Sequence, residues 1–490
     1  MKLIGRFTLV CFLYFVFGKV VAQPCTCHEL LTGLITKVES NYAGYIHKVK
    51  EHKENKEYLL LKGQLTQKSN STNYNDCYQL LSQYVRFFND GHLFIIEIPR
   101  ITAGQSDSLS QYIKHFDLSE EKLKDFVHQA KTDPLEGVWN DKSQKIAILK
   151  NGINSFIGVT LENTNAQWKR GMIKMEIEKV KPNEYNLTIY RNDFAPIRFT
   201  QVHIYKNSVL PFGVYRFARE SPVSPELNYI NNTDPELPVF RQLDTNTCLI
   251  TVPTALINPA ILDSILRSNE QALTTTPNLI IDVRGNLGGN YIWGGLQALT
   301  NTKEYPEPKK ENEDEFLMLA SEDNADYVFG MSTYLRNTKN SAGVAHYDTL
   351  IAKLRNFPGE FIGFSFYNSA QGNNKRTVYK FPQQIAILMD KGTASAGEAF
   401  VLSVKANSDK VTLYGENTYG MIDYMNTNAK KIPCQGNNSY YYGYPTFFAP
   451  SIKTSPVNPT GIKPDIYVSP GTEDWIEWVK LDLSNKKKKE

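Results

Sequence analysis

Ser395 lies in a segment whose composition suits a reactive hydroxyl group. The segment spans residues 392–398, with the sequence GTASAGE, and it follows an apolar run at 384–389. A helical pattern at 396–407 comes next, so the serine sits where a predicted strand gives way to a helix. The unpaired amides of a helix start are suitable donors for a tetrahedral oxyanion. Serine is also a common helix N-cap, and the local sequence leaves both interpretations open.

A second segment of interest covers residues 282–290, with the sequence DVRGNLGGN, directly after the apolar run 279–281. The paired glycines Gly288 and Gly289 let backbone amides approach a ligand closely, although a plain tight turn uses glycine in the same way. The segment has neither the G-x-G-x-x-G of a dinucleotide-binding turn nor the lysine of a phosphate-binding loop. It therefore indicates an amide-rich turn and not a nucleotide site.

A third segment supplies a candidate base. Of the eight histidines, His92 lies in a polar turn, 90–92, with the sequence DGH, ahead of an apolar run at 93–98. A serine nucleophile needs a base that titrates near neutral pH, and histidine is the usual one. A lone histidine in a turn can equally be structural, so this segment gains meaning only from the others.

Together with two further blocks, these segments resemble the tail-specific (C-terminal-processing) and tricorn-core serine peptidase family. The blocks follow the family's order: 90–92, 282–289, 392–398 followed by 415–420 (GENTYG), and 461–466 (GIKPDI). The resemblance implies an α/β, crotonase/Clp-like core. It makes Ser395 the nucleophile and the backbone amides of Gly288 and Ala396 the oxyanion hole. No metal or cofactor is expected.

The base departs from the commonest version of that family. Met421 stands where the tail-specific branch carries a lysine, and a thioether cannot accept a proton in its place. The departure favours the tricorn-like branch, in which a histidine from the N-terminal part is the base, and His92 matches that role. The group that orients the histidine is left open between Asn458, Asp423 and Glu416. Asparagine orients a catalytic imidazole in papain-like enzymes.

The pattern of the remaining chain divides it into regions. Residues 28–88 and 108–131 have helical spacing, whereas 137–215 alternate as half-buried strands do. Those strands favour a small barrel and not a PDZ domain, so selectivity for C-terminal tails is not implied. The predicted organisation is a signal peptide (1–22), an N-terminal helical region carrying His92 (23–132), an all-β domain (133–220), a linker (221–239), a peptidase core (240–480) with an insertion that could be a lid (301–380), and a basic tail (481–490).

The N-terminus has the layout of an export signal. Lys2 and Arg6 precede an apolar run at 7–17, and small residues end the segment at Ala22. The apolar run is too short for a membrane anchor. A lipid anchor on Cys25 is not favoured, because Pro24 directly precedes the cysteine and no Leu-x-x-small run leads into it. The chain is therefore expected to be exported, to the periplasm, the cell surface or the extracellular space.

Composition and the number of cysteines further narrow the class of protein. The chain of 490 residues is 41% hydrophobic and 21% charged with a net charge of +3, and nothing in it indicates a nucleic-acid partner or a membrane span. Five of the six cysteines lie after the predicted signal, which is too few for a disulfide scaffold. One disulfide is expected, from Cys77 to Cys25 or Cys27. No cysteine pair has the spacing of a zinc site.

The sequence thus predicts a secreted serine endopeptidase that hydrolyses protein or peptide substrates through an acyl-enzyme on Ser395. The alternative is a catalytically inactive protein on the same scaffold that binds a peptide or a lipophile. The absent lysine and the open choice of orienting group are what keep this alternative in view. Substrate specificity and oligomeric state are not encoded in any pattern that we find.

Overall fold

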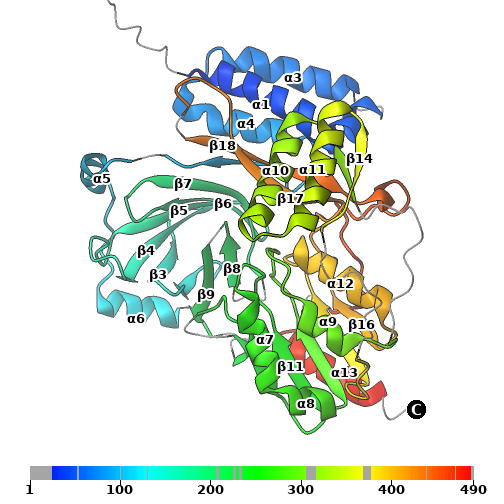
Figure 1. Cartoon of the computed structure of the whole chain (residues 1–490). Coiled ribbons are helices and arrows are strands. Elements are labelled where there is room, and N and C mark those ends of the chain that lie inside the picture. The colour runs from blue at the N-terminus through cyan, green and yellow to red at the C-terminus, as the bar shows by residue number, and fades with distance from the viewer. Residues whose placement is uncertain are drawn as a thin grey trace, which may run out of the picture.

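Three β-sheets and an N-terminal group of helices make up the structure, a computed structural model (Figure 1). It describes residues 25–486, apart from 52–54, 100, 130, 206–208, 214, 224–227, 231–233, 305–315, 368–376, 438 and 470. The predicted signal peptide, residues 1–22, lies outside the described residues. Among the described residues, no helix combines the length and the hydropathy that crossing a bilayer requires.

The N-terminal helices form because apolar residues recur at helical spacing. The elements are α1 (Cys27–Asn41), α2 (Ala43–Tyr45), the π-helical turn η1 (Ile46–Lys50), α3 (Asn55–Ser69), the 3-10 turn η2 (Tyr74–Asp76) and α4 (Cys77–Arg86). Thr26 begins α1 with a capping box, in which its hydroxyl and the Glu29 carboxylate each accept a backbone N–H. The apolar faces of α1 and α4 are buried in one shared core.

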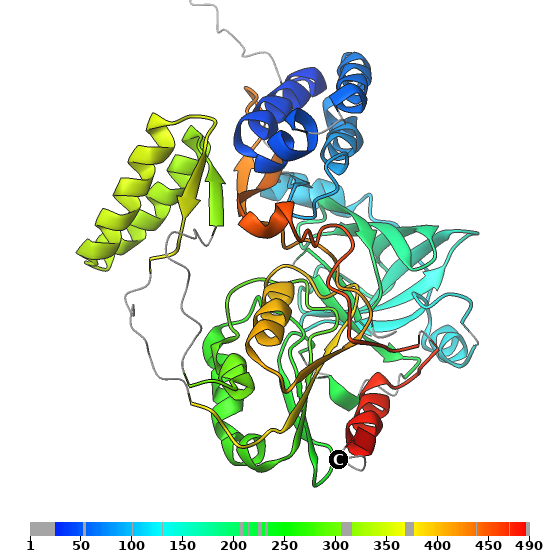
Figure 2. The same ribbon diagram turned by 90° about the vertical axis from the view of Figure 1, so that its right-hand side faces the viewer.

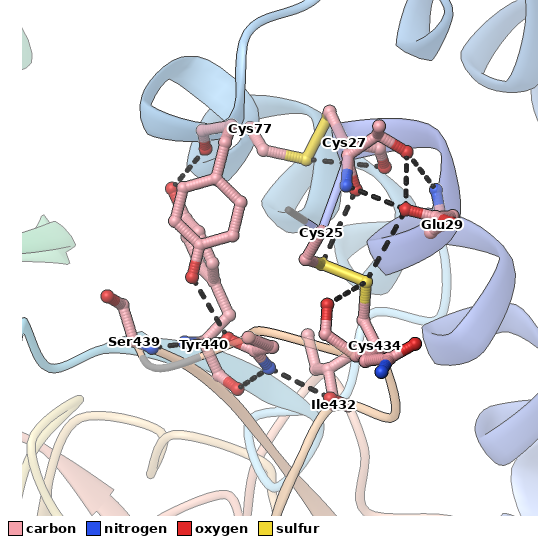
Figure 3. Close-up of a disulfide and its surroundings, with 12 residues drawn as sticks. Cys25, Cys27, Glu29, Cys77, Ile432, Cys434, Ser439 and Tyr440 are labelled. Carbon is pink, nitrogen blue, oxygen red and sulfur yellow. Dashed lines mark hydrogen bonds between the residues drawn. A yellow bond between two sulfur atoms is a disulfide. The ribbon is translucent and has the colours of Figure 1, made fainter. Parts of the chain in front are cut away.

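Two disulfides fasten this helical group (Figure 3). Cys27–Cys77 joins α1 to α4, which is one of the two pairings the sequence left open. Cys25–Cys434 is a second bridge that the sequence did not predict, and it spans 409 positions of the chain. Glu29 lies beside Cys434, but both sulfurs of that bridge are oxidised and offer no thiolate to a metal. Cys248 is free and buried.

The helix expected over 108–131 is interrupted. The structure has α5 (Ala103–Ser110) and α6 (Glu120–His128), with an extended stretch between them. In that stretch the Phe116 N–H donates to the Gly171 carbonyl, and the Ile173 N–H donates to the Lys114 carbonyl. The prediction of one helix is wrong there because pairing with the neighbouring sheet satisfies the same backbone groups.

The all-β region is a nearly closed barrel, as the alternating pattern predicted. Its eight antiparallel strands lie in the order β7-β6-β5-β4-β3-β2-β9-β8, and the end strands β7 and β8 contact each other. The strands are β2 (Gly137–Asn140), β3 (Gln144–Lys150), β4 (Ser155–Asn163), β5 (Ile173–Lys181), β6 (Glu184–Tyr190), β7 (Pro196–Val202), β8 (Val209–Phe212) and β9 (Tyr215–Ser221). Large apolar side chains such as Trp139 and Tyr185 fill its interior.

The α/β core is a six-stranded sheet in the order β10-β11-β12-β15-β16-β19. It consists of β10 (Val239–Gln242), β11 (Thr247–Thr251), β12 (Asn278–Asp282), β15 (Gln384–Met389), β16 (Val411–Gly415) and β19 (Ile466–Tyr467), parallel except for β10. One face is covered by α7 (Pro259–Ser268), α8 (Glu270–Thr275), α9 (Gly294–Thr300) and α12 (Ala396–Asn407), the other by α13 (Trp475–Lys486). Burial on both faces explains the continuous apolar runs.

The third sheet draws on three distant parts of the chain. Its order is β1-β18-β13-β14, with β17 beside β18, and it comprises β1 (Phe94–Glu97), β13 (Phe316–Leu319), β14 (Phe361–Phe364), β17 (Tyr424–Lys431) and β18 (Tyr440–Phe448). The helices α10 (Glu322–Asn337) and α11 (Ser341–Asn356) cover β13 and β14 (Figure 2). Within the segment 301–380, β13 and β14 therefore extend this sheet, which was not predicted.

Candidate active site

Ser395 stands in a strained turn at the carboxyl end of β15. Its backbone has φ 51° and ψ −115°, a left-handed value that non-glycine residues seldom adopt. Asp390, the residue after β15, holds the turn because its Oδ1 accepts the N–H groups of Gly392 (2.9 Å) and Gly285 (2.8 Å). One buried carboxylate thus fixes the serine turn and the glycine-rich loop after β12 together.

His92 lies just before β1 of the third sheet and approaches Ser395 from that side. Its Nε2 lies 2.9 Å from the Ser395 Oγ, and its Nδ1 lies 2.7 Å from the carbonyl oxygen of Tyr424. A carbonyl can only accept a hydrogen bond, so Nδ1 carries the proton. Nε2 is then the acceptor, and the Ser395 hydroxyl donates to it. This is the tautomer that a base acting on Ser395 requires.

The same surroundings keep His92 neutral. Burial of the imidazole lowers its pKa below the usual 6.5, and this effect outweighs the nearby Asp90 charge and the Tyr424 hydrogen bond, which both raise it. His92 is only 6% exposed. At neutral pH the ring is therefore available to accept a proton.

The glycine-rich loop lies directly against Ser395. A Cβ placed on Gly288 would lie 2.8 Å from the Ser395 Cβ and 3.0 Å from the Ala396 nitrogen, which is closer than real side chains come. The Gly288 N–H itself donates to the Asn286 Oδ1 at 2.9 Å. Within the described part of the chain, the Ala396 N–H has no acceptor. The two predicted oxyanion amides therefore lie side by side. The Gly288 N–H already donates to Asn286, whereas the Ala396 N–H is available to donate to a ligand.

Glu398 organises the loop that follows the serine helix. It is completely buried, and its carboxylate accepts from the Ser395 N–H (3.1 Å) and the Thr418 hydroxyl (2.5 Å). It also accepts from the amides of Gly420 (2.8 Å) and Met421 (2.9 Å). Burial raises the pKa of this carboxyl, while the hydrogen bonds act in the opposite direction. The lysine-equivalent position, Met421, is thereby held by its backbone.

Two of the three candidate orienting side chains, Asn458 and Asp423, are bonded to backbone amides of neighbouring residues. The Asn458 Oδ1 accepts the amides of Ile422 and Asp423, and the Asp423 carboxylate accepts those of Val457 and Asn458. Glu416 lines a cavity next to the site. The Nδ1 atom of His92 instead contacts the Tyr424 carbonyl.

That cavity, of about 860 Å³, lies between the barrel, the N-terminal region and the core. Residues from all three parts line it, among them Gly91, Gln201, His203, Asp390, Glu416 and Tyr419. Ser395 and His92 do not line it themselves. It adjoins the pair through Gly91, where a Cβ would lie 3.1 Å from the Tyr419 ring. The cavity is therefore next to the reacting atoms and not around them.

Comparison with known proteins identifies the class. Residues 246–468 match the model of peptidase family S41. By that match, residues 246–468 of the chain belong to peptidase family S41. The chain is a serine-type peptidase, and its matched region carries both Gly288 and Ser395. No curated protein matches the chain.

Solved structures of several peptidases are distantly similar to this S41 peptidase. Mature CPAF complexed with lactacystin has 15% identity and a TM-score of 0.46, over 94% of this chain and 97% of that chain. The photosystem II D1 C-terminal processing protease has 11% identity and a TM-score of 0.36, over 91% and 95%. The tricorn protease has 9% identity and a TM-score of 0.35, over 94% and 36%. No role of any residue is transferred from them.

Three contributors to the site of this S41 peptidase had no prediction attached. Tyr424 acts through its carbonyl, which every residue type possesses, so the sequence held no signal for it. Asp390 was detectable as an acid placed directly after a buried strand and two positions before a glycine. Glu398 stood inside the serine segment but was given no role. Its spacing, three residues after Ser395, matches that of a capping box.

Proposed function

We propose that this S41 peptidase is an exported serine endopeptidase that cleaves peptide bonds through an acyl-enzyme on Ser395, with His92 as its general base. The observation that carries the proposal is the 2.9 Å contact between the His92 Nε2 and the Ser395 Oγ, together with the tautomer that Tyr424 imposes. A base within hydrogen-bond reach and in the correct tautomer is what such a mechanism needs.

The proposed reaction has two halves. In the first, the Ser395 Oγ attacks the substrate carbonyl carbon while its proton passes to the His92 Nε2. The tetrahedral oxyanion collapses, the C–N bond breaks, and His92 gives the proton to the leaving amine. In the second, His92 takes a proton from water, the hydroxyl attacks the ester, and Ser395 regains its proton as the acid departs.

The oxyanion would be held by the amides of Ala396 and Gly288. The proposal is supported by the close approach of the Gly288 loop to the serine and by the uncommitted Ala396 N–H. The Gly288 N–H, which donates to Asn286 in the substrate-free protein, would be shared between Asn286 and the oxyanion. Donors aimed at the developing charge are the largest single contribution in such sites.

Export is supported by the two disulfides, because such bridges persist in oxidising compartments. The proposal includes removal of the predicted signal peptide after Ala22. Sequencing the N-terminus of the exported protein tests this part, and we expect it to begin at Gln23. A mature protein that retains residues 1–22 would contradict it.

Hydrolysis of an unfolded protein such as casein tests the catalytic part. We expect turnover by the unaltered protein and a loss of about 1,000-fold or more in Ser395→Ala and His92→Ala. Ser403→Ala is the matched control, because Ser403 lies on the same helix and accepts a hydrogen bond from Gln297 away from the site. Equal turnover by Ser395→Ala and Ser403→Ala would overturn the proposal.

A further inference from the structure

Asp90 is a buried carboxylate beneath the candidate base, with a defined partner on each oxygen. Its Oδ1 accepts the backbone N–H of His92 at 2.9 Å, and its Oδ2 accepts the Tyr42 hydroxyl at 2.6 Å. The side chain is 7% exposed. Burial, and secondarily the Asp90 charge, raise the pKa of Tyr42 well above 10, so Tyr42 remains a neutral donor at every working pH.

Among the described residues, no carboxylate forms a hydrogen bond with the His92 ring, whose two nitrogens contact Tyr424 and Ser395. When Ser395 loses its proton, His92 becomes a buried imidazolium, and its Nδ1 faces only the neutral carbonyl of Tyr424. An uncompensated charge in such a place is costly. The carboxylates of Asp423 and Glu398 are turned toward backbone amides of other segments. Asp90 is the carboxylate attached to the histidine's own turn.

The titratable groups that interact with Asp90, or with its neighbour Asp423, come from four parts of the chain. Lys48 of η1 is a cation among them, and it lies over the Tyr424 ring and donates to the Phe88 carbonyl. Tyr42 at the end of α1 and Tyr424 of β17 are neutral, because burial, the largest cause, raises the pKa of each phenol. Burial likewise raises the pKa of Asp423 and Tyr419.

We propose that Asp90 is a positioning residue that supplies the counter-charge for His92, while the Tyr42 hydroxyl donates to its second oxygen. This inference rests on the proposed function. Asp90 does not touch the ring, and it acts through the backbone turn that it caps and through its charge. Consistent with this geometry, the Asp90 charge opposes the effect of burial on the His92 pKa. It would supply a negative charge that Asn458, a candidate orienting group with a neutral amide, does not carry.

Two substitutions separate the charge of Asp90 from its hydrogen bonds. Asp90→Asn is isosteric: its oxygen can still accept the His92 N–H, and its amide can donate to the Tyr42 oxygen, so mainly the charge is lost. Tyr42→Phe leaves the charge and removes one hydrogen bond. If Asp90 only capped the turn, neither substitution would lower the pKa of His92.

The measurement is the titration of the His92 ring by NMR, in a Ser395→Ala background that needs no turnover. We expect Asp90→Asn to lower the midpoint by about one pH unit, and Tyr42→Phe to leave it unchanged or raise it. In the active protein, Asp90→Asn should lower kcat by about tenfold on the pH plateau, which is the same loss of charge stabilisation. KM should change little.

An unchanged midpoint in Asp90→Asn would overturn the inference, and so would a lowered midpoint in Tyr42→Phe. If Asp90→Asn does not fold, a lowered midpoint in Tyr42→Phe still overturns the inference. Failure of the proposed function is recognised separately. In that case the unaltered protein shows no hydrolysis that depends on Ser395, whereas the NMR titration still reports whether Asp90 acts on His92.

Discussion

The backbone of Ser395 shows how the chain places a hydroxyl group. A positive φ on a non-glycine residue costs on the order of 1–3 kcal/mol and persists where its surroundings enforce it. Here Glu398 holds the Ser395 N–H, and Asp390 holds the turn before it. In this conformation the Ser395 side chain points away from the end of β15 and toward His92.

The pH dependence of activity follows from the lowered pKa of His92. Only the neutral ring accepts a proton, so kcat/KM rises with pH through the pKa of His92 and then levels. Because burial lowers that pKa, the rise should be centred below pH 6.5. A profile of kcat/KM at constant ionic strength from about pH 4.5 to 9 checks this. A midpoint at or above pH 7 would contradict the burial of a neutral base.

The identities of the candidate residues were the most accessible part of the site from sequence. Ser395 and His92 could be singled out because their types, their turn context and their order along the chain agree with one family pattern. Their contact across 303 positions could not be obtained from spacing. The partner of Nδ1 was out of reach for a different reason, since Tyr424 contributes an atom common to all residues.

At the scale of elements, the site depends on the close contact between the glycine-rich loop after β12 and the turn that carries Ser395. Gly288 has φ +93°, and a Cβ there would meet the Ser395 Cβ at 2.8 Å. We expect Gly288→Ala to push the loop from Ser395 and to lower kcat by about 100-fold or more, as loss of an oxyanion donor does. Gly294→Ala is the matched control, because nothing lies within 4 Å of a Cβ there.

Thermal unfolding measured alongside separates this effect from simple loss of folded protein. Gly294→Ala should retain activity near that of the unaltered protein. If Gly288→Ala hydrolysed substrate as fast as Gly294→Ala, the loop could not be part of the site.

Glu398 tests whether α12 and the loop 418–421 form one unit. Its two oxygens accept four donors, and in Glu398→Gln an NH₂ group must face two of them. We expect a loss of about 2–4 kcal/mol in the free energy of unfolding, from repelled and unsatisfied buried donors. Chemical denaturation measures it. Glu477→Gln is the control, because it removes only a surface ion pair of a half-exposed carboxylate with Lys480. An equally small change in both variants would mean that the unit does not depend on Glu398.

Secondary structure was predicted well where burial determines the hydropathy pattern of a segment. It was predicted poorly where the segment forms backbone hydrogen bonds with a distant part of the chain. The runs at 279–281 and 385–388 are apolar throughout because helices cover both faces of their sheet, so the parallel core was evident. The stretch at 111–119 has helical spacing, yet its backbone pairs with Gly171 and Ile173 of the barrel region. Such pairing depends on a partner that local sequence does not reveal.

At the scale of the whole molecule, the site lies where two sheets meet. The core sheet positions Ser395 and Gly288, whereas the third sheet positions His92, which precedes β1, and Tyr424, which begins β17. The barrel joins them: Arg216 of β9 donates to the Gly285 carbonyl at 2.9 Å. None of these long-range placements follows from composition or periodicity, since each depends on segments hundreds of positions apart.

The Cys25–Cys434 bridge ties the residues just before α1 to the turn between β17 and β18 (Figure 3). We expect the double substitution Cys25→Ser and Cys434→Ser to cost about 3–5 kcal/mol of stability, since the bridge closes a very long loop. Activity against urea concentration, under non-reducing conditions, measures the shift. Cys248→Ala removes a thiol but no bridge, and a shift as large in that control would contradict the assignment.

Labelling with a fluorophosphonate probe tests the central claim most directly, because the probe reacts with an activated serine whatever the natural substrate is. Mass spectrometry of the digested protein then locates the adduct. We expect one adduct, on Ser395, formed at neutral pH, absent in Ser395→Ala and slowed by about 100-fold or more in His92→Ala. An unlabelled native protein, or labelling that persists equally in Ser395→Ala, would contradict the pairing of Ser395 with His92.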